Sequence, residues 1–208
     1  MEGIGFFEVV STQLQITNYK PDPVPMEAIE KVLDAATKAP SGRNTQPWNF
    51  IVITDRNLIA EVSRVYLEQW LEDQGEEPPH DEHPVYRRAR HLAHHMHEVP
   101  VMILVCVDHS RAFIPYKPGD PIMRGRYANS IWPAIQNLFL AARALGLGTR
   151  LTTTHIPREP AIKALLGIPD HVEIVVITPL GYPRGKFRAP NRRPAEEFTF
   201  YNGWGQKA

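Results

Sequence analysis

The side chains best suited to hold a flat polar ligand lie together in residues 39–48, which read APSGRNTQPW. Pro40 ends any helix that precedes it, and Gly42 permits the close approach of a ligand to the backbone. Hydrogen-bonding groups on this rigid turn come from Ser41, Asn44, Thr45 and Gln46. The stretch therefore predicts a turn that can bind a polar ring system, although an ordinary helix-to-strand connection would have the same composition.

Four histidines form a second candidate group within residues 91–97 of a predicted basic helix. His91 and His95 are four residues apart, a spacing at which two histidines on a helix can bind one metal ion. No pattern of carboxylates or cysteines completes such a site. We therefore predict no metal site and interpret the cluster as a polar helix face, while Arg90 or His91 could instead contact a cofactor or substrate.

Two further reactive groups are excluded as catalytic residues. Cys106 lies in the middle of an apolar run, which is typical of a core residue rather than of a nucleophile. Asp108, His109 and Ser110 have the composition of a catalytic triad, but three consecutive residues cannot present its geometry. We therefore assign no side chain to nucleophilic catalysis.

Large aromatic side chains are frequent in and beside two long connections, residues 72–86 and 108–127. Connections of this length inside a compact domain are uncommon and often functional. The rings assigned to an aromatic substrate are Phe113, Tyr116, Tyr127 and Trp132. Packing of the same rings at a subunit surface is an equally good interpretation.

The composition excludes several classes of function. Lys and Arg total 23, as do Asp and Glu, so the formal net charge is zero, which argues against a nucleic-acid partner. The longest apolar run, residues 99–107, is too short to cross a bilayer, and residues 1–10 do not form a secretory signal. Cys106 is the one cysteine, so an intramolecular disulfide cannot form. We expect no membrane partner and a reducing, cytoplasmic location.

Hydrophobic periodicity predicts the elements that must position these residues. Helices are predicted near residues 25–38, 55–71, 87–97, 130–145 and 157–166, after a short helix in the first 20 residues. Strands are predicted at residues 49–54, 99–107, 148–154 and 172–177. The second strand is apolar almost throughout, as expected of a strand covered on both faces. Asp55 or Asn57, and Asn129 or Ser130, are the expected N-caps of two helices.

Helices and strands alternate along the chain, but the short connection at residues 154–157 does not by itself establish a parallel crossover. The predicted class is therefore α+β, with a central, mostly antiparallel sheet flanked by helices on both faces. We expect one domain, residues 1–208, which ends in an extended C-terminal tail, residues 180–208. The tail is basic and rich in aromatic residues, so we predict that it wraps a partner subunit.

Several stretches together resemble the FMN-dependent nitroreductase family. They are residues 20–25 (KPDPVP), the turn at 39–48, residues 131–149 (from IWPAIQN to LGLGT), and residues 179–183 (PLGYP) followed by RRP at 192–194. These motifs cover nearly the whole chain. The resemblance implies an intertwined homodimer with two FMN sites at the subunit interface. It also implies that NADH or NADPH reduces the flavin, which then reduces a second substrate.

The resemblance also implies which residues contact FMN. Pro40, Ser41, Gly42 and Asn44 would contact the flavin ring from one subunit, and Gln136 belongs to a matching motif. Backbone amides near Thr153 and Thr154 would face flavin N5 from the other subunit, and no catalytic side chain is assigned. Arg192 or Arg193 would reach the phosphate. Gln13, Gln15 and Thr17 stand where the family has further phosphate contacts, and we expect them to hydrogen-bond the phosphate as well.

One segment departs from the family pattern. The family usually has a basic cluster before the position of Tyr19, whereas residues 13–18 read QLQITN and contain no cation. Losing two charge-assisted hydrogen bonds costs about 3–6 kcal/mol, which is two to four decades of affinity. Three outcomes are open: the polar side chains and a tail arginine replace the cluster, FMN binds weakly, or the site takes another ligand or none. We favour the first, because the ring-side motif is intact.

The implied function is transfer of hydride from NAD(P)H through FMN to an electron-poor acceptor such as a nitroaromatic or a quinone. One alternative keeps the flavin and changes the reaction to ene reduction, dehydrogenation, reductive dehalogenation or flavin fragmentation. The other is a relative that binds flavin weakly or not at all and serves as a ligand-binding protein.

Overall fold

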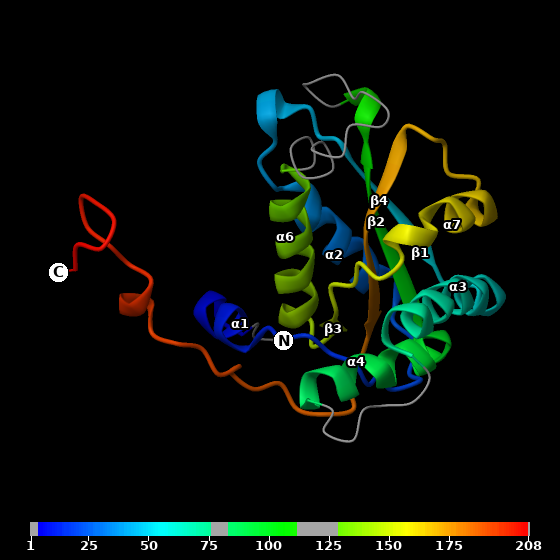
Figure 1. Ribbon diagram of the computed structural model, residues 1–208, viewed down its shortest axis with the longest axis horizontal. Coiled ribbons are helices and arrows are strands. Elements are labelled where there is room, and N and C mark those ends of the chain that lie inside the picture. The colour runs from blue at the N-terminus through cyan, green and yellow to red at the C-terminus, as the bar shows by residue number, and fades with distance from the viewer. Residues whose placement is uncertain (1–3, 76–82, 112–128, 208) are drawn as a thin grey trace.

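A four-stranded antiparallel sheet forms the centre of the protein (Figure 1). The structure is a computed structural model and describes residues 4–75, 83–111 and 129–207. The sheet order is β1 (Trp48–Ile53), β2 (Val101–Asp108), β4 (Val172–Gly181) and β3 (Gly148–Thr149), and every neighbouring pair is antiparallel. The predicted α+β class with an antiparallel sheet is confirmed.

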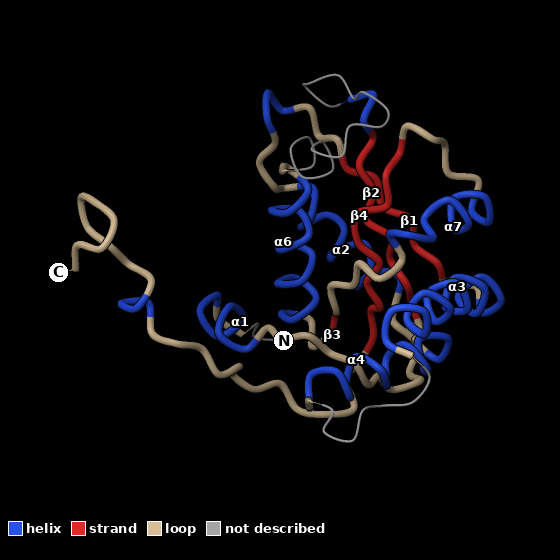
Figure 2. Tube along the Cα trace, viewed as in Figure 1, coloured by secondary structure: helices blue, strands red, loops and turns tan. Residues whose placement is uncertain are grey.

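Helices cover both faces of this sheet (Figures 1 and 2). One face carries α2 (Met26–Thr37) and α6 (Ile131–Ala144), with α1 (Phe6–Thr12) packed against α6. The other face carries α3 (Arg56–Gln74), α4 (Pro84–His95) and α7 (Glu159–Leu166). Short 3₁₀ turns complete the described elements at Gly42–Asn44, Met96–Glu98, His109–Arg111, Ile156–Arg158 and Ala195–Glu197.

Strand β2 separates two hydrophobic cores because its side chains alternate between the faces of the sheet. Met102, Leu104 and Cys106 pack into the core beneath α3 and α4. Val101, Ile103, Val105 and Val107 pack into the core beneath α2 and α6. Seven of the eight residues in β2 are buried, which confirms the prediction of a strand covered on both faces.

Several predicted boundaries hold, and their local signals explain why. Asp55 caps α3 as predicted, since its carboxylate accepts hydrogen bonds from the amides of Asn57 and Leu58. Gly146 and Gly167 follow α6 and α7 with φ of 75° and 66°, a left-handed conformation that glycine adopts without strain. Ser130 is the N-cap residue of α6, one of the two predicted, but its side chain makes no capping hydrogen bond to the helix.

The strand predicted at residues 148–154 is shorter than expected. Regular pairing stops at Thr149, and Thr152 touches β4 only through an isolated bridge to Ile177. Side chains here replace the backbone hydrogen bonds of a regular strand pair. Gln15 Oε1 accepts a hydrogen bond from the Leu151 amide at 2.6 Å, and the Thr152 hydroxyl donates one to the Ile177 carbonyl at 2.6 Å. Strand β4, in contrast, runs past residue 177 to Gly181, where it pairs with both β2 and β3.

The C-terminal tail leaves the body of the molecule after β4 (Figure 1). Because β4 extends to Gly181, the tail begins at residue 182 rather than 180. Its aromatic side chains are exposed in the single chain, with Phe198 58%, Tyr201 53% and Trp204 92% accessible. Its packing across a partner subunit stays a prediction. Within the described residues, no helix is both long and apolar enough to span a membrane.

Cys106 is fully buried in β2, and burial raises the pKa of its thiol to about 12, with a further upward contribution from the charge of Glu159. The thiolate is the reactive form, so we expect Cys106 not to react with a thiol reagent in the native protein at neutral pH. Colorimetric thiol titration checks this expectation, with the protein in denaturant as the control in which one thiol reacts. Full reaction under native conditions at the rate of an exposed thiol would contradict it.

Candidate cofactor site

The turn between α2 and β1 has an unusual backbone. Arg43, Asn44 and Gln46 have positive φ values of 51°, 57° and 47°, in a backbone region that residues other than glycine rarely occupy. The Gln46 amide donates to the Ser41 hydroxyl at 3.0 Å, which closes the turn. Such strained backbone persists where the surrounding structure holds it, and it often marks a functional site.

This turn is held against the N-terminal end of α6. The Gly42 amide donates to the hydroxyl of Ser130, the N-cap residue of α6, at 3.1 Å. Asn137 also ties α6 to α2 through a hydrogen bond from Nδ2 to the Ala35 carbonyl at 3.2 Å. Trp132 and Gln136 are exposed one helical turn apart on α6. The structure therefore brings four predicted ring contacts, Pro40, Ser41, Gly42 and Asn44, together beside the start of α6.

A second group of predicted contacts lies in the extended segment after α1. The Ile16 amide donates to the Thr149 carbonyl at 2.9 Å, so the segment runs alongside β3. Gln15 uses its side-chain oxygen on the Leu151 amide, which leaves its amide nitrogen for a ligand. Gln13 Nε2 is buried and has no hydrogen-bond partner among the described residues. A buried donor without a partner is costly, so this nitrogen is suited to an anionic or polar ligand.

The two groups lie at opposite ends of α6. Gly42 meets Ser130 before the first turn of α6, whereas Thr12 accepts a 2.9 Å hydrogen bond from Arg143 in the last turn. The helix has 14 residues and is therefore about 20 Å long at 1.5 Å per residue. One chain thus presents the turn and the segment 13–17 at well-separated places.

Thr153 and Thr154 follow the isolated bridge that Thr152 makes with β4. Neither backbone amide donates a hydrogen bond to another group in the described part of the chain. Thr153 is exposed, and the Thr154 hydroxyl interacts with the phenol of Tyr66, whose pKa is raised mainly by burial. Two adjacent amides without internal partners can donate to a ligand, as the resemblance implies for flavin N5.

Arg192 and Arg193 lie on the C-terminal tail. Arg192 donates to the Asn191 carbonyl, and Arg193 pairs with Glu197 at 3.2 Å and lies over the ring of Phe198. These described contacts are all within the tail. The structure of the single chain therefore does not bring the tail arginines to Gln13, Gln15 and Thr17.

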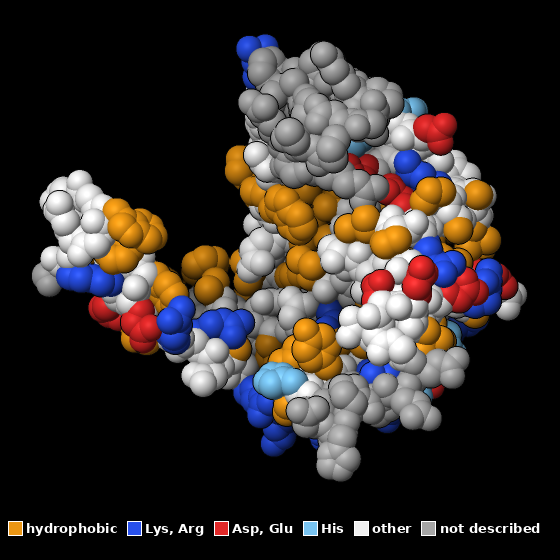
Figure 3. All heavy atoms as spheres, viewed as in Figure 1, with side chains coloured by type: hydrophobic (Ala, Val, Ile, Leu, Met, Phe, Trp, Pro, Cys, Tyr) orange, Lys and Arg blue, Asp and Glu red, His pale blue; other side chains and the backbone are white. Residues whose placement is uncertain are grey.

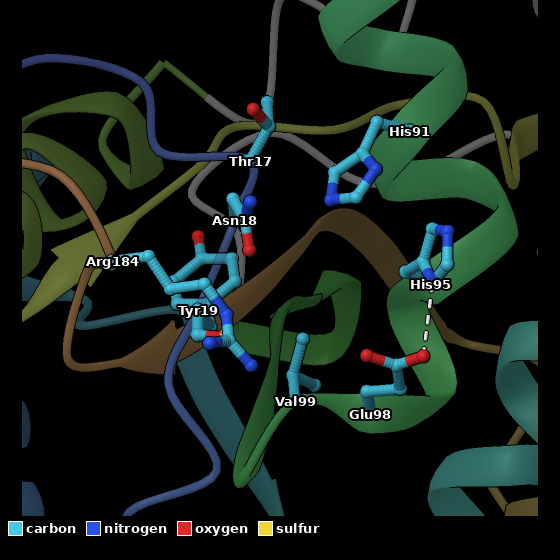
Figure 4. Close-up of a pocket in the computed structure, with 8 residues that line it drawn as sticks. All are labelled: Thr17, Asn18, Tyr19, His91, His95, Glu98, Val99 and Arg184. Carbon is cyan, nitrogen blue, oxygen red and sulfur yellow. Dashed lines mark hydrogen bonds and ion pairs between the residues drawn. The ribbon is translucent and has the colours of Figure 1, made fainter.

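A polar cavity of about 220 Å³ lies at the Thr17 end of the segment (Figure 4). It is lined by Thr17, Asn18, Tyr19, His91, His95, Glu98, Val99 and Arg184. His91 points from α4 toward Thr17 and Asn18, and Arg184 lies beside the ring of Tyr19 (Figure 4). The sequence pointed to His91, with Glu98 adjacent to the histidine cluster, but not to Arg184. Arg184 could have been identified as a candidate site residue from the sequence, because it directly follows the Gly-Tyr-Pro motif.

Arg150 is a second cation that sequence reasoning missed. Burial lowers the pKa of its guanidinium, and the phenols of Tyr66 and Tyr19 are its ionisable neighbours. It has no carboxylate partner within ion-pair distance in the ranges that the structure describes. Burial also raises the pKa of Tyr19, whose hydroxyl donates to the Ile16 carbonyl at 2.9 Å. A positive charge is thus present near residues 16–19, although the segment itself carries none.

The other predicted groups have simpler outcomes. Three of the four predicted substrate rings, Phe113, Tyr116 and Tyr127, lie outside the described residues. His109 pairs with Glu173 at 2.9 Å, while Ser110 bonds Asp108, so the three consecutive residues do not form a triad. The described side chains include no group of three His, Cys, Asp or Glu that could hold a metal ion.

The fold and these motifs belong to a known class of protein. A model of the nitroreductase family matches residues 16–182, which is most of the chain. The chain therefore belongs to the nitroreductase family, whose members are flavin oxidoreductases, and the predicted resemblance is confirmed. The matched region includes the turn at 39–48, Thr153 and Thr154, and it ends before Arg192.

Individual relatives show how varied the family is. A protein of Methanothermobacter thermautotrophicus with the provisional name NADH dehydrogenase/NAD(P)H nitroreductase is 32% identical over 178 residues, 85% of this chain and 76% of the relative. Iodotyrosine deiodinase 1 of Rattus norvegicus is 31% identical over 185 residues, 86% of this chain and 62% of the deiodinase, so the chain spans less than two thirds of that relative.

A solved structure of oxidized iodotyrosine deiodinase, bound to FMN and 3-iodo-L-tyrosine, has a TM-score of 0.73 to this chain. The two are 23% identical, and the alignment covers 91% of this chain and 96% of the deiodinase chain. At this identity the likeness shows a shared fold.

Proposed function

We propose that this protein is an NAD(P)H-dependent flavin oxidoreductase that binds FMN between two copies of the chain. The observation that carries the proposal is the separation of two groups of ligand-binding residues by the length of α6. One group is the turn at residues 40–44, and the other comprises residues 13–17 with the amides of Thr153 and Thr154. A two-fold axis that sets the first group of one copy against the second group of its partner would create two equivalent sites.

The residues of the chain fit the parts of FMN. The turn supplies a glycine backbone and small polar side chains for the edge of the ring, with Gln136 nearby on α6. The free amides of Thr153 and Thr154 suit a ring nitrogen that gains electron density, because fixed donors stabilise such charge. Gln13, Gln15 and Thr17 supply neutral donors for the phosphate, and Arg192 or Arg193 supplies positive charge. FMN, when bound, provides the hydride chemistry, while the protein orients it and excludes water.

The surface supports a homodimer. Hydrophobic side chains gather over α1 and α6 on the face that borders the tail (Figure 3). The exposed large side chains on these two helices are Phe6, Phe7, Val10 and Trp132, which are 67%, 83%, 46% and 42% accessible. An apolar patch of this kind is typical of an interaction surface, and the exposed tail aromatics suit the same partner.

The first experiment is an absorption spectrum of the purified protein, followed by titration with FMN. We expect flavin bands after purification or saturable binding of added FMN, together with the mass of a dimer in sedimentation. Turnover of NADH and of NADPH with a nitroaromatic and with a quinone then identifies the donor and the acceptor class. A colourless protein that binds no FMN would overturn the proposal and favour a flavin-free, ligand-binding role.

Reductive dehalogenation is a second candidate for the same site. The observation that favours it is the 31% identity to iodotyrosine deiodinase 1 over most of this chain. In that reaction a carbon–iodine bond would be replaced by a carbon–hydrogen bond and iodide would leave, with two electrons and one proton supplied by reduced flavin. Incubation of the reduced protein with 3-iodo-L-tyrosine, followed by measurement of tyrosine and iodide, decides between this candidate and nitroaromatic or quinone reduction.

A further inference from the structure

The polar cavity in Figure 4 contains more charge than the proposed function uses. It brings together Arg184 of the tail, His91 and His95 of α4, and Glu98 of the following 3₁₀ turn. Arg184 is held in place by two bonds to the segment beside it. Its Nε donates to the Tyr19 carbonyl at 2.9 Å, and its amide donates to the Asn18 carbonyl at 3.1 Å.

The two histidines are coupled to each other. Their ring centroids are 4.4 Å apart, and His95 Nδ1 lies 2.8 Å from the Glu98 carboxylate. Burial lowers the pKa of His91, the positive charge of a protonated His95 lowers it further, and Glu98 opposes both effects. His95 is thus the member of the pair that contacts the carboxylate. His91, which points into the cavity, stays neutral at pH 7 while the cavity holds no anion.

An anion in the cavity reverses this balance. The Glu98 carboxylate is occupied by its contact with His95, and the guanidinium of Arg184 supplies positive charge on the wall of the cavity. An anion next to Arg184 and His91 would favour protonation of His91, because an opposite charge within a few ångströms stabilises the charged form. Thr17 and Asn18 add neutral polar groups on the same wall.

We propose that this cavity binds a phosphate monoester group, and that His91 takes up a proton when it does. The site supplies positive charge that residues 13–18 lack. The phosphate has two chemical sources, the terminal phosphate of FMN and the 2′-phosphate of NADPH. The assignment of the phosphate to FMN or NADPH rests on the proposed function. Phosphate binding by the cavity does not, since it can be tested with inorganic phosphate alone.

Other charged groups around the cavity must be counted in its pH dependence. His97 lies 3.9 Å from the Glu98 carboxylate, and Arg56 donates to the carbonyls of Glu98 and Val99. Lys20 is next to Tyr19 in the chain, and Arg90 donates to the Gly75 carbonyl. Both arginines stay charged at all relevant pH values. His97 and His95 are therefore the groups that must be titrated alongside His91.

The direct test follows the imidazole signals of the protein by NMR during titration with inorganic phosphate. The His91 signals are assigned by their loss in the variant His91→Gln. We expect phosphate to raise the pKa of His91 by about one unit, the low end of the effect of a close opposite charge. A His91 pKa that is the same with and without saturating phosphate would overturn the proposal, as would an absence of phosphate binding.

The second test compares ligands that differ by one phosphate. Affinities for FMN and riboflavin, and for NADPH and NADH, are measured at about pH 6 and about pH 8, on either side of the histidine range. For one of these two pairs, we expect the ratio of the affinities for the phosphorylated and unphosphorylated ligands to be about tenfold smaller in His91→Gln than in the native protein at the lower pH. A tenfold change corresponds to the loss of one charged hydrogen bond. Phosphate monoesters themselves titrate near pH 6, so only differences between variants are interpreted.

His94→Gln is the matched control, because His94 is exposed on the same helix and does not line the cavity. The pair of ligands that responds to His91→Gln but not to His94→Gln identifies the source of the phosphate. A protein that binds phosphate at His91 but no flavin would retain this inference and refute the proposed function. A protein that binds FMN, but whose preference for the phosphorylated ligand is the same in the native protein and both variants for both ligand pairs, would retain the proposed function and refute this inference.

Discussion

Replacement of both tail arginines, Arg192→Gln with Arg193→Gln, is expected to weaken FMN binding by about two to four decades. The segment 13–18 has no cation, so the proposed phosphate contacts there are neutral. Charge-assisted hydrogen bonds to phosphate are roughly twice as strong as neutral ones. Among the described residues these arginines bond within the tail, so their replacement should not disturb the body of the protein.

The measurement is the dissociation constant of FMN, with riboflavin as the ligand that lacks the phosphate. Riboflavin affinity should be unchanged in the double variant. The matched control is Lys186→Gln with Arg188→Gln, which removes the same charge from exposed positions of the same tail. An FMN affinity within a few-fold of the native value would show that the charge comes from elsewhere, and Arg150 and Arg184 would then be the next candidates.

Gly148→Val is expected to be the most destabilising single change at the edge of the sheet. A Cβ atom at Gly148 would lie 2.5 Å from Cγ1 and 2.9 Å from Cβ of Ile16, closer than carbon atoms approach in proteins. Ile16 is buried, and its amide bonds Thr149, so it cannot move aside without breaking that link. Overpacking of this kind costs about 3 kcal/mol in the free energy of unfolding, or roughly 6–12 °C in Tm for a chain of this size.

Denaturant unfolding at a fixed protein concentration measures this cost, and a fixed concentration matters because dimerisation would add to the apparent stability. Gly185→Val is the control, since a Cβ at Gly185 meets no atom within 4 Å. We expect the control to unfold like the native protein. Equal stability of the Gly148 and Gly185 variants would show that the segment around Ile16 separates from β3 at little cost.

The same contact connects stability to function. Gly148 lets the segment 13–17 lie directly on the edge of the sheet, where Gln15 reaches the amide of Leu151. Displacement of this segment would shift Gln13, Gln15 and Thr17 from their places along β3 and Leu151. A destabilised Gly148 variant that still folds should therefore also bind FMN more weakly.

Much of the fold could be read from local pattern. The apolar run at residues 99–107 predicted a doubly covered strand, and β2 is that strand. Asp55 and Gly167 mark a helix start and a helix end because capping depends on the few residues beside them. The strand predicted at 148–154 is shorter than expected for a tertiary reason, since the Leu151 amide donates instead to the side chain of Gln15, 136 positions away in the chain.

The sequence by itself determined the family. The motifs at 39–48 and 179–183, with the missing cations at 13–18, were visible without coordinates because each lies within ten consecutive residues. Only the tertiary structure decided that the turn and the segment 13–17 stand at opposite ends of α6, and that Arg184 and His91 share one cavity. Such contacts depend on how whole helices and strands pack, which local propensity and periodicity do not encode.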